Sequence, residues 1–431
     1  MTTRRLALRA DLLDITADPG LSAVDTPALR FDADTWLLVE DGRIAGRTRE
    51  TPGEDWDKRD FTGRLLLPGF IDTHVHCPQL DVIASHGEAL LPWLERYVFP
   101  AERRFAEAQA AREGADRFLD LLLAHGTTSA VVFPTVHKVS VEALFEAAAG
   151  HGMRLVTGKV LMDRHVPDYL SDDVAGAERD CTELIERWHG KGRAAYALTP
   201  RFAPTSTPAQ LDMAGRLLSR YEGTYMHTHV AENRDEVRWV AELFPQARSY
   251  LDVYAAHGLL NERSVLAHGI WLDDGDRALL ADSGAHVAHC PTSNLFLGSG
   301  LLDWVKLQDA GVAVSLATDV GAGTTLSMTR TLAEAYKVQA LQGVKLSAWK
   351  ALYAATRGAA RALRLEHEIG TLDVGATADL ALWDWAHGPL AQHRDRLARE
   401  LHERVFAWMT LGDERNLVSA WVAGTERWRR G

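Results

Sequence analysis

The sequence predicts an α/β protein in two parts. A (β/α)8 TIM-like barrel is expected over residues 68–369, and residues 1–67 and 370–431 are expected to form one small β-sandwich domain. In the middle of the chain, eight short apolar runs alternate with helix-length amphipathic segments over roughly 300 residues, and such a barrel typically needs ~250 residues. Both ends carry strand and turn patterns instead. The length of 431 residues also leaves room for a sizeable core and more than one domain.

The N-terminal part is rich in strand signals. Residues 36–39 (WLLV) form an apolar run, Asp41-Gly42 is a turn signal, and residues 43–45 (RIA) follow it. This order is typical of a β-hairpin. A further apolar strand at residues 65–67 ends at Pro68-Gly69.

The barrel follows from the strand–helix alternation. Strands are expected at residues 70–76, 129–135, 154–161, 194–202, 224–231, 264–270, 286–290 and 313–318. Between them, residues 101–126 predict a helix that ends at a glycine, and Thr207-Pro208 predicts a helix N-cap with proline in the first turn. A doubly wound sheet is the competing architecture, but it usually needs fewer strands.

The C-terminal part changes pattern again. Residues 370–384 and 415–424 predict short strands separated by glycine turns. Each end of the chain alone is short for a core, so we expect the two ends to fold together.

Composition excludes several classes of protein. The chain has 47 basic and 59 acidic residues, a formal net charge of −12, so neither nucleic acid nor an anionic membrane is expected as a partner. Cys77, Cys181 and Cys290 form no CxxC pair, which argues against a disulfide scaffold or a zinc finger. No signal-peptide pattern and no membrane-length apolar stretch is visible, so the expected location is the cytoplasm.

Polar side chains recur where the predicted barrel strands end. His74 and His76 share one face of a strand because alternate residues point the same way. With 18 histidines, about 0.75 pairs of histidines separated by one residue are expected by chance. His227 and His229 form a second pair of this kind. Strand ends converge on one face of a barrel, and the other polar residues expected there are Arg201, Glu232, His268 and Asp319. Three imidazoles and one carboxylate suit Zn²⁺ or Fe²⁺, with one position left for water.

Longer motifs resemble the amidohydrolase superfamily. They are PGFIDTHVHCPQ, HVAEN, LAHG and ATDVGAG, at residues 68–79, 229–233, 266–269 and 317–323. Finer motifs resemble the guanine deaminases within that superfamily. They are HCPQLDVIASHGEALLPWLERYVFPAE, TPRFAPTS, HVAENRDEVRWVAELFP and LGDERNLVSAWVAG, at residues 76–102, 199–206, 229–245 and 411–424. Together these motifs extend over nearly the whole chain.

The resemblance implies a role for individual residues. The implied metal ligands are His74, His76, His229 and Asp319. The implied catalytic residues are Glu232 as proton shuttle, His268 as a hydrogen-bonding partner of water or substrate, and Asp319. The implied substrate-binding residues are His76, Gln79, Arg201, Phe202, His229, Glu232 and Asp319. His227 matches no role and is taken as structural.

The resemblance further implies a metal-dependent aminohydrolase that converts guanine to xanthine and ammonia. The planar donors of Arg201 suit the carbonyl O6 of guanine, Gln79 both donates and accepts hydrogen bonds, and Phe202 offers a stacking face. From the residues alone, a salt bridge for Arg201 and core packing for Phe202 are the favoured interpretations. One alternative is a related mononuclear aminohydrolase acting on a triazine, a pterin or a modified purine. Another is a non-catalytic scaffold, which would be expected to lose ligands, and none of the matched set is absent.

The implied cofactor is one divalent metal per chain, Zn²⁺ or alternatively Fe²⁺, and the implied assembly is a homodimer. A binuclear site would need a carboxylated lysine at the end of the fourth barrel strand. That strand ends in residues 199–202 (TPRF), without a lysine, and Lys159 lies on the third strand. The sequence therefore favours a single metal ion.

Overall fold

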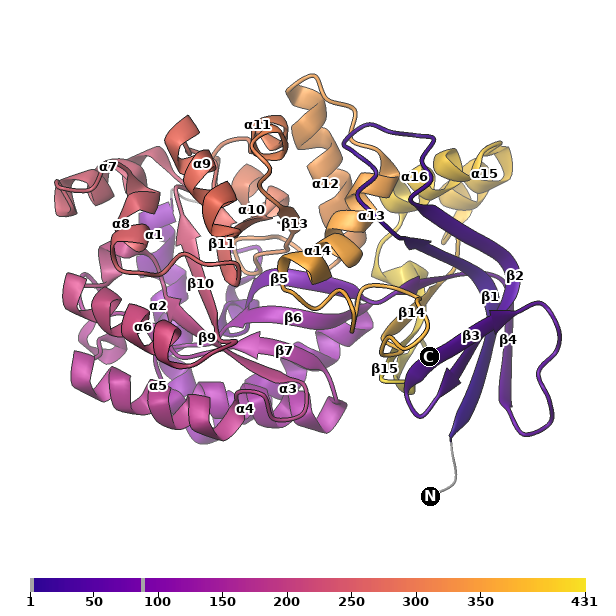
Figure 1. The fold of residues 1–431 in the computed structure, drawn as a ribbon, viewed down its shortest axis with the longest axis horizontal. Coiled ribbons are helices and arrows are strands. Elements are labelled where there is room, and N and C mark those ends of the chain that lie inside the picture. The colour runs from indigo at the N-terminus through magenta and orange to yellow at the C-terminus, as the bar shows by residue number, and fades with distance from the viewer. Residues whose placement is uncertain (1–3, 87–89) are drawn as a thin grey trace.

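The computed structural model describes residues 4–86 and 90–431. Figure 1 shows a barrel surrounded by helices, with the sheet built by the chain ends at one side of it. The barrel strands are β5 (Phe70–His76), β6 (Thr127–Phe133), β7 (Arg154–Thr157), β8 (Val160–Leu161), β9 (Ala194–Pro200), β10 (Tyr225–Val230), β11 (Ser264–His268), β12 (His286–His289) and β13 (Val314–Leu316). The predicted barrel with a β domain from both chain ends is confirmed.

The barrel sheet is parallel and runs in the order β5-β6-β7-β9-β10-β11-β12-β13, with β8 paired to β9. Two backbone hydrogen bonds join the segment after β13 to β5. The amide of Asp319 donates to the carbonyl of His74 at 2.9 Å, and the amide of His76 donates to the carbonyl of Val320 at 2.8 Å. The ends of the first and last strands are therefore held side by side.

The barrel strands are buried along most of their length, and β6 along all of it, because helices cover the outside of a parallel barrel. The covering helices are α3 (Ala108–Ala124), α4 (Lys138–His151), α5 (Val174–Trp188), α6 (Pro208–Arg220), α7 (Arg234–Leu243), α8 (Tyr250–Ala256), α9 (Asp274–Ser283), α10 (Pro291–Phe296), α11 (Trp304–Asp309), α12 (Met328–Leu341), α13 (Ala348–Ala355) and α14 (Arg357–Ala362). The predicted N-cap of α6 is confirmed, since the Thr207 hydroxyl accepts from the amide of Gln210. The single helix expected over residues 101–126 is wrong at its start: Glu107 is extended, and α3 begins only at Ala108.

The chain ends share one seven-stranded sheet. Its strands are β1 (Arg5–Ile15), β2 (Leu29–Glu40), β3 (Arg43–Thr48), β4 (Asp57–Pro68), β14 (Leu380–Trp383), β15 (Leu417–Val422) and β16 (Thr425–Arg429), in the order β16-β15-β14-β4-β1-β2-β3. The predicted hairpin is present as β2 and β3, and Asp41 and Gly42 both have the positive φ that its tight turn requires. Antiparallel pairing of β4 with β14 joins the two ends.

The C-terminal part contains less strand and more helix than expected. Within residues 370–384, only β14 is a strand. Helices α15 (Pro389–Leu397) and α16 (Leu401–Leu411) then lie between β14 and β15, where no helix was expected from the sequence. Residues of α16 pack into the barrel's hydrophobic cluster, Val405 and Met409 among them, so this helix is stabilised by contacts distant in sequence.

A helical segment after β5 covers the carboxyl ends of the barrel strands. It consists of a 3-10 turn (Pro78–Val82), α1 (Leu90–Trp93), a π-helical turn (Leu94–Val98), α2 (Phe99–Arg103) and a further 3-10 turn (Arg104–Ala106). Trp93 and Phe99 pack with Phe133 of β6 in one apolar cluster. Within the motif at residues 76–102, residues 87–89 lie outside the described part of the chain. Across the described ranges, none of the helices has both the length and the apolar character needed to cross a bilayer.

Candidate active site

Four predicted ligands meet at the carboxyl end of the barrel. His74 and His76 come from β5, His229 from β10, and Asp319 from the segment after β13. Nε2 of His76 lies 3.2 Å from Nε2 of His74 and 3.2 Å from Nε2 of His229. Oδ1 of Asp319 lies 3.1 Å from Nε2 of His74 and 3.2 Å from Nε2 of His76. The sequence expectation that these side chains converge is therefore met.

These distances fit a single small cation. Zinc ligands lie ~2.0–2.2 Å from the metal, and the edges of such a tetrahedron are about 3.3–3.6 Å long. The four donor atoms all lie within 4.8 Å of one another. Three imidazole nitrogens and one carboxylate oxygen are also a donor set that Zn²⁺ and Fe²⁺ accept. The four residues thus fit one divalent metal ion.

The other ring nitrogens of two ligands are held by neighbours. Nδ1 of His74 lies 2.7 Å from Nε2 of His227, and Nδ1 of His229 lies 2.6 Å from the carbonyl oxygen of Arg201. A hydrogen bond at Nδ1 fixes the tautomer in which Nε2 carries a lone pair for a metal. His227, taken as structural from the sequence, is therefore in direct contact with a candidate ligand.

Protonation in the cluster also favours a cation. Burial lowers the pKa of His76 to about 3 and lowers the pKa of His74 and His229, so these imidazoles are neutral. Burial alone would raise the pKa of Asp319, but the adjacent His74 and His76 hold the pKa of this carboxyl well below its usual range. Metal binding requires neutral imidazoles and an ionised carboxylate.

A second possible ligand group includes a thiol. His74, His268, Cys290 and Asp319 also bring four donor atoms within 4.8 Å. Burial raises the pKa of Cys290 well above its ordinary value, and its Sγ lies 3.4 Å from the carbonyl oxygen of Ala288. A protonated thiol is a poor ligand, so the set of three histidines and Asp319 is the better candidate.

Two titratable side chains border the ligand group. Glu232, which follows β10, is 3% exposed, and its Oε1 accepts a hydrogen bond from the Ser299 hydroxyl at 2.9 Å. Burial, reinforced by the charge of Asp319, raises the pKa of Glu232 to about 8, so this group carries a proton at neutral pH. Nε2 of His268 lies 3.5 Å from Oε2 of Glu232 and 3.8 Å from Oδ2 of Asp319. A proton donor thus stands beside the ligand carboxylate.

The backbone at the site is locally unfavourable. His268 has φ 73° and Asp319 has φ 51°, in the left-handed region that non-glycine residues rarely occupy. Asn294 of α10 contacts the His268 ring, its Oδ1 lying 2.9 Å from Nδ1. Strained conformations of this kind persist where surrounding contacts determine them, often at functional sites.

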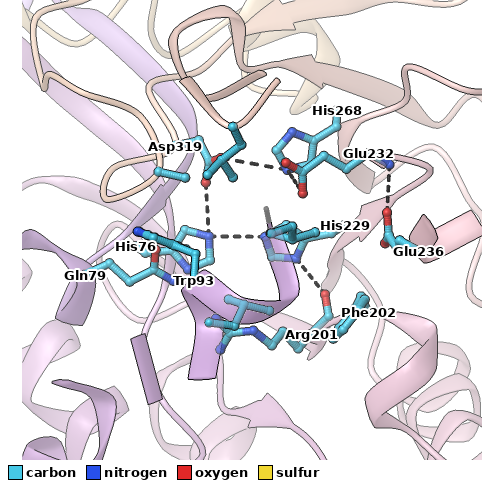
Figure 2. A pocket seen from close by; sticks show the side chains of 14 residues that line it. His76, Gln79, Trp93, Arg201, Phe202, His229, Glu232, Glu236, His268 and Asp319 are labelled. Atoms are coloured by element: carbon cyan, nitrogen blue, oxygen red, sulfur yellow. Dashed lines mark hydrogen bonds and ion pairs between the residues drawn. The ribbon is translucent and has the colours of Figure 1, made fainter. Parts of the chain in front are cut away.

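A pocket opens beside the ligand group. Figure 2 shows Gln79, Arg201 and Phe202 around it, together with the candidate ligands His76, His229 and Asp319 and with Glu232 and His268. Its lining residues are His76, Gln79, Leu90, Trp93, Leu94, Arg201, Phe202, His229, Glu232, Glu236, His268, Leu297, Asp319 and Ala322. All seven residues predicted to bind substrate therefore line one cavity.

The recognition residues are fixed by contacts of their own. Oε1 of Gln79 accepts from the amide of Gly321 at 3.3 Å, which leaves its NH₂ group for another partner. Nη1 of Arg201 donates to the buried carboxylate of Glu102. Phe202 is 5% exposed. The salt bridge anticipated for Arg201 is present, and the same residue also lines the pocket.

Several residues at the site were not singled out from the sequence. Trp93 and Leu94 cover the pocket, and Glu102, Asn294 and Ser299 hold polar groups within it. Glu102 and Trp93 lie within the motif at residues 76–102, which could have drawn attention to them. Asn294 and Ser299 carry no spacing signal that distinguishes them from ordinary helix and loop residues.

Comparison with known proteins defines the family. The model of the Amidohydrolase family matches residues 65–427. This match covers the barrel and most of the C-terminal part. The chain belongs to the amidohydrolase family.

Individual relatives narrow the comparison to one activity. A curated guanine deaminase from Escherichia coli (strain K12) is 44% identical over 429 residues, covering 97% of this chain and 96% of the relative. A probable guanine deaminase from Deinococcus radiodurans is 40% identical, covering 96% and 97%. The resemblance to guanine deaminases drawn from the motifs is confirmed.

Solved structures of guanine deaminases are similar to this chain as well. The E. coli guanine deaminase superposes with a TM-score of 0.94 at 43% identity, covering 99% of this chain and 100% of that one. A guanine deaminase from C. acetobutylicum with guanine bound in its active site gives a TM-score of 0.89 at 27% identity, also covering 99% and 100%. The likeness therefore includes both parts of the fold.

Proposed function

We propose that this protein hydrolyses guanine to xanthine and ammonia, with one divalent cation held by His74, His76, His229 and Asp319. The observation that carries the proposal is a single cavity. It brings together three of the four candidate ligands, Glu232, and the side chains Gln79, Arg201 and Phe202. The relatives named guanine deaminase support the same substrate.

Recognition of the purine follows from the pocket residues. The Arg201 guanidinium supplies N–H donors to the carbonyl O6. The NH₂ group of Gln79 donates to an acceptor on the ring, and Phe202 lies against the ring face. The buried surroundings exclude bulk water, which strengthens these polar contacts. The amine-bearing C2 is thereby placed towards the ligand group.

When bound, a divalent cation lowers the pKa of a water molecule from 15.7 towards ~7. The chain's own groups then move the protons. Asp319 accepts the first proton of the attacking water, and Glu232 gives its proton to ring N3 as the oxygen adds to C2. Glu232 next carries the remaining hydroxyl proton to the amine, which leaves as ammonia while C2 becomes a carbonyl. The proton on Asp319 returns to Glu232 through His268, which lies 3.8 Å and 3.5 Å from the two carboxylates.

An ammonia-release screen tests the substrate. The purified protein is assayed with guanine, adenine, cytosine, 8-oxoguanine, pterins and aminotriazines, with kcat/KM measured for each. We expect guanine to be turned over best. A triazine, pterin or modified purine ranking well above guanine would replace the proposal with the related aminohydrolase considered above, and no turnover of any compound would favour a scaffold.

Metal analysis tests the cofactor. We propose Zn²⁺, with Fe²⁺ as the alternative, at about one ion per chain. Elemental analysis of the protein as purified distinguishes the two, and His76→Ala should lose the ion. The proposals of a cytoplasmic location and a homodimer rest on the sequence and its family resemblance, and fractionation and light scattering check them.

A further inference from the structure

A buried ion pair at the wall of the pocket involves a residue that the proposed mechanism does not use. Nη1 of Arg201 lies 2.8 Å from Oε1 and 2.9 Å from Oε2 of Glu102. Arg201 is 3% exposed and Glu102 is fully buried. Glu102 belongs to α2, far from Arg201 in sequence, and does not itself line the pocket.

The pair leaves part of the guanidinium available. Both carboxylate oxygens contact the same nitrogen, so the pair does not use the N–H groups of Nε and Nη2. Phe99, three residues before Glu102 on the same helix face, holds its ring 5.7 Å from the guanidinium carbon. One helix therefore contacts both the face and one edge of the Arg201 head group.

The main chain of Arg201 is fixed as well. Its carbonyl accepts hydrogen bonds from Nδ1 of His229 at 2.6 Å and from the amide of His229 at 3.2 Å. Its amide donates to the carbonyl of Leu161 at 3.2 Å. With the backbone held in this way, the direction of the side chain depends on its partners, of which Glu102 is the charged one.

We propose that Glu102 is a positioning and specificity residue: its buried carboxylate orients Arg201 so that the remaining N–H groups meet the ring carbonyl of the substrate. This inference rests on the proposed function. A carboxylate that neutralises Arg201 also makes the pocket suit a neutral ring with a carbonyl acceptor. A guanidinium without this partner would be an uncompensated buried charge, free to turn or to attract an anion. A merely stabilising ion pair would have no effect on which ring is preferred.

Two ligands that undergo no deamination isolate the contribution of the carbonyl. Hypoxanthine has the ring carbonyl of guanine but no amine at C2, and purine lacks both. Calorimetric titration of the metal-loaded protein gives the Kd of each. Loss of one hydrogen bond to a charged group corresponds to roughly 10- to 100-fold in Kd. The wild type should therefore prefer hypoxanthine over purine by about this factor.

Four variants distinguish positioning from packing. Arg201→Met should remove most of the preference for hypoxanthine. Glu102→Gln keeps the side-chain shape, and it should lower the preference by about tenfold. The double variant should be no worse than Arg201→Met alone, because both substitutions remove the same contact. Glu102→Asp keeps the charge but moves it away from Arg201 by one methylene, so it should also weaken the preference for hypoxanthine. This variant tests the same contact if Glu102→Gln fails to fold.

A matched control is available at the other end of β5. Asp379 is 2% exposed and pairs with Arg193, and its carbonyl accepts from the amide of Gly69 just before β5. Asp379→Asn should lower Tm and leave the ligand preference at the wild-type value. Bound metal should be unchanged in Glu102→Gln.

The outcomes distinguish the positioning role of Glu102 from the proposed purine site. Folded Glu102→Gln or Glu102→Asp with a wild-type preference would overturn the positioning role, as would an equal loss of affinity for both ligands. If the wild type binds neither compound, the proposed purine site itself fails. If Asp379→Asn alters the preference as strongly as Glu102→Gln, the effect is general loosening and the inference is wrong.

Discussion

Replacement of Glu232 by glutamine removes the carboxyl group that protonates ring N3 and the leaving amine in the proposed mechanism. The substitution keeps the size of the side chain, and the Gln amide oxygen can still accept from the Ser299 hydroxyl, which lies 2.9 Å from Oε1 in the wild type. None of the four candidate ligand atoms belongs to Glu232. We therefore expect the variant to fold and to bind its metal normally.

The size of the effect follows from the burial of this group. Burial raises the pKa of Glu232 from 4.5 to about 8, which makes the acid form available near neutral pH. A general acid–base group contributes about 10²- to 10⁴-fold to rate, and kcat of Glu232→Gln should fall by that factor. In the wild type, kcat/KM should fall about tenfold per pH unit above this pKa, since the acid form is the reactive one. A bound cation lowers the pKa of a nearby carboxyl, so the decline begins at or below pH 8.

Ammonia release from guanine between pH 6 and 10, with metal content measured in parallel, tests this reasoning. Asp235→Asn, which removes an exposed carboxylate three residues further along, is the control and should retain activity. Ser299→Ala removes a hydrogen bond that lowers the pKa of Glu232, so the alkaline decline should move to higher pH. Near-normal turnover in Glu232→Gln would remove Glu232 from the mechanism, and loss of its metal would mean that it serves the ligand site instead.

Three further predictions concern metal and stability. His227→Ala should weaken metal affinity about 10- to 100-fold because the Nδ1 partner of His74 is lost, and chelator competition measures this; unchanged affinity would contradict it. Removal of the metal by a chelator should abolish turnover and lower Tm, and Zn²⁺ or Fe²⁺ should restore both; full activity after removal would exclude a metal role. Burial opposes ionisation of Asp373, but hydrogen bonds from Arg357 and Arg30 lower its pKa from 3.8 to about 2. The ionised Asp373 should contribute about 1 kcal/mol to the free energy of unfolding, after allowance for solvent exposure. This contribution should be complete above pH 5 and disappear as pH falls from 3.8 through 2. Denaturant unfolding should therefore show Asp373→Asn less stable than the wild type at pH 6, and the difference in stability should already be smaller at pH 3.

The barrel was predictable because its signal is local and periodic. Each expected strand overlaps an observed one, and the first expected strand coincides with β5. The candidate ligands were predictable because the carboxyl ends of barrel strands lie on one face of the barrel. The sequence motifs contain His74, His229 and Asp319 at these ends. The C-terminal helices were missed because α16 depends on packing against the barrel, which a local pattern does not contain.

The supporting contacts of the site could not be derived from the sequence. Glu102 meets Arg201 across 99 positions of sequence, and Ser299 meets Glu232 across 67 positions. Such pairs are set by how strands and helices are placed, and any buried carboxylate or hydroxyl would look the same in the sequence. His227 shows this limit most directly. It belongs to a histidine pair that is visible in the sequence, yet only the fold shows that it contacts the candidate ligand His74 and is not in the ligand group itself.

The placement of β4 has a consequence for synthesis on the ribosome. Its inner edge pairs with β14, Leu65 lying opposite Trp383, and the whole barrel sequence is translated between them. Until β14 emerges, Leu65, Leu66 and Leu67 form an open apolar edge of the kind that templates aggregation. Nascent chains stalled before residue 380 should therefore depend on chaperones far more than chains released at full length.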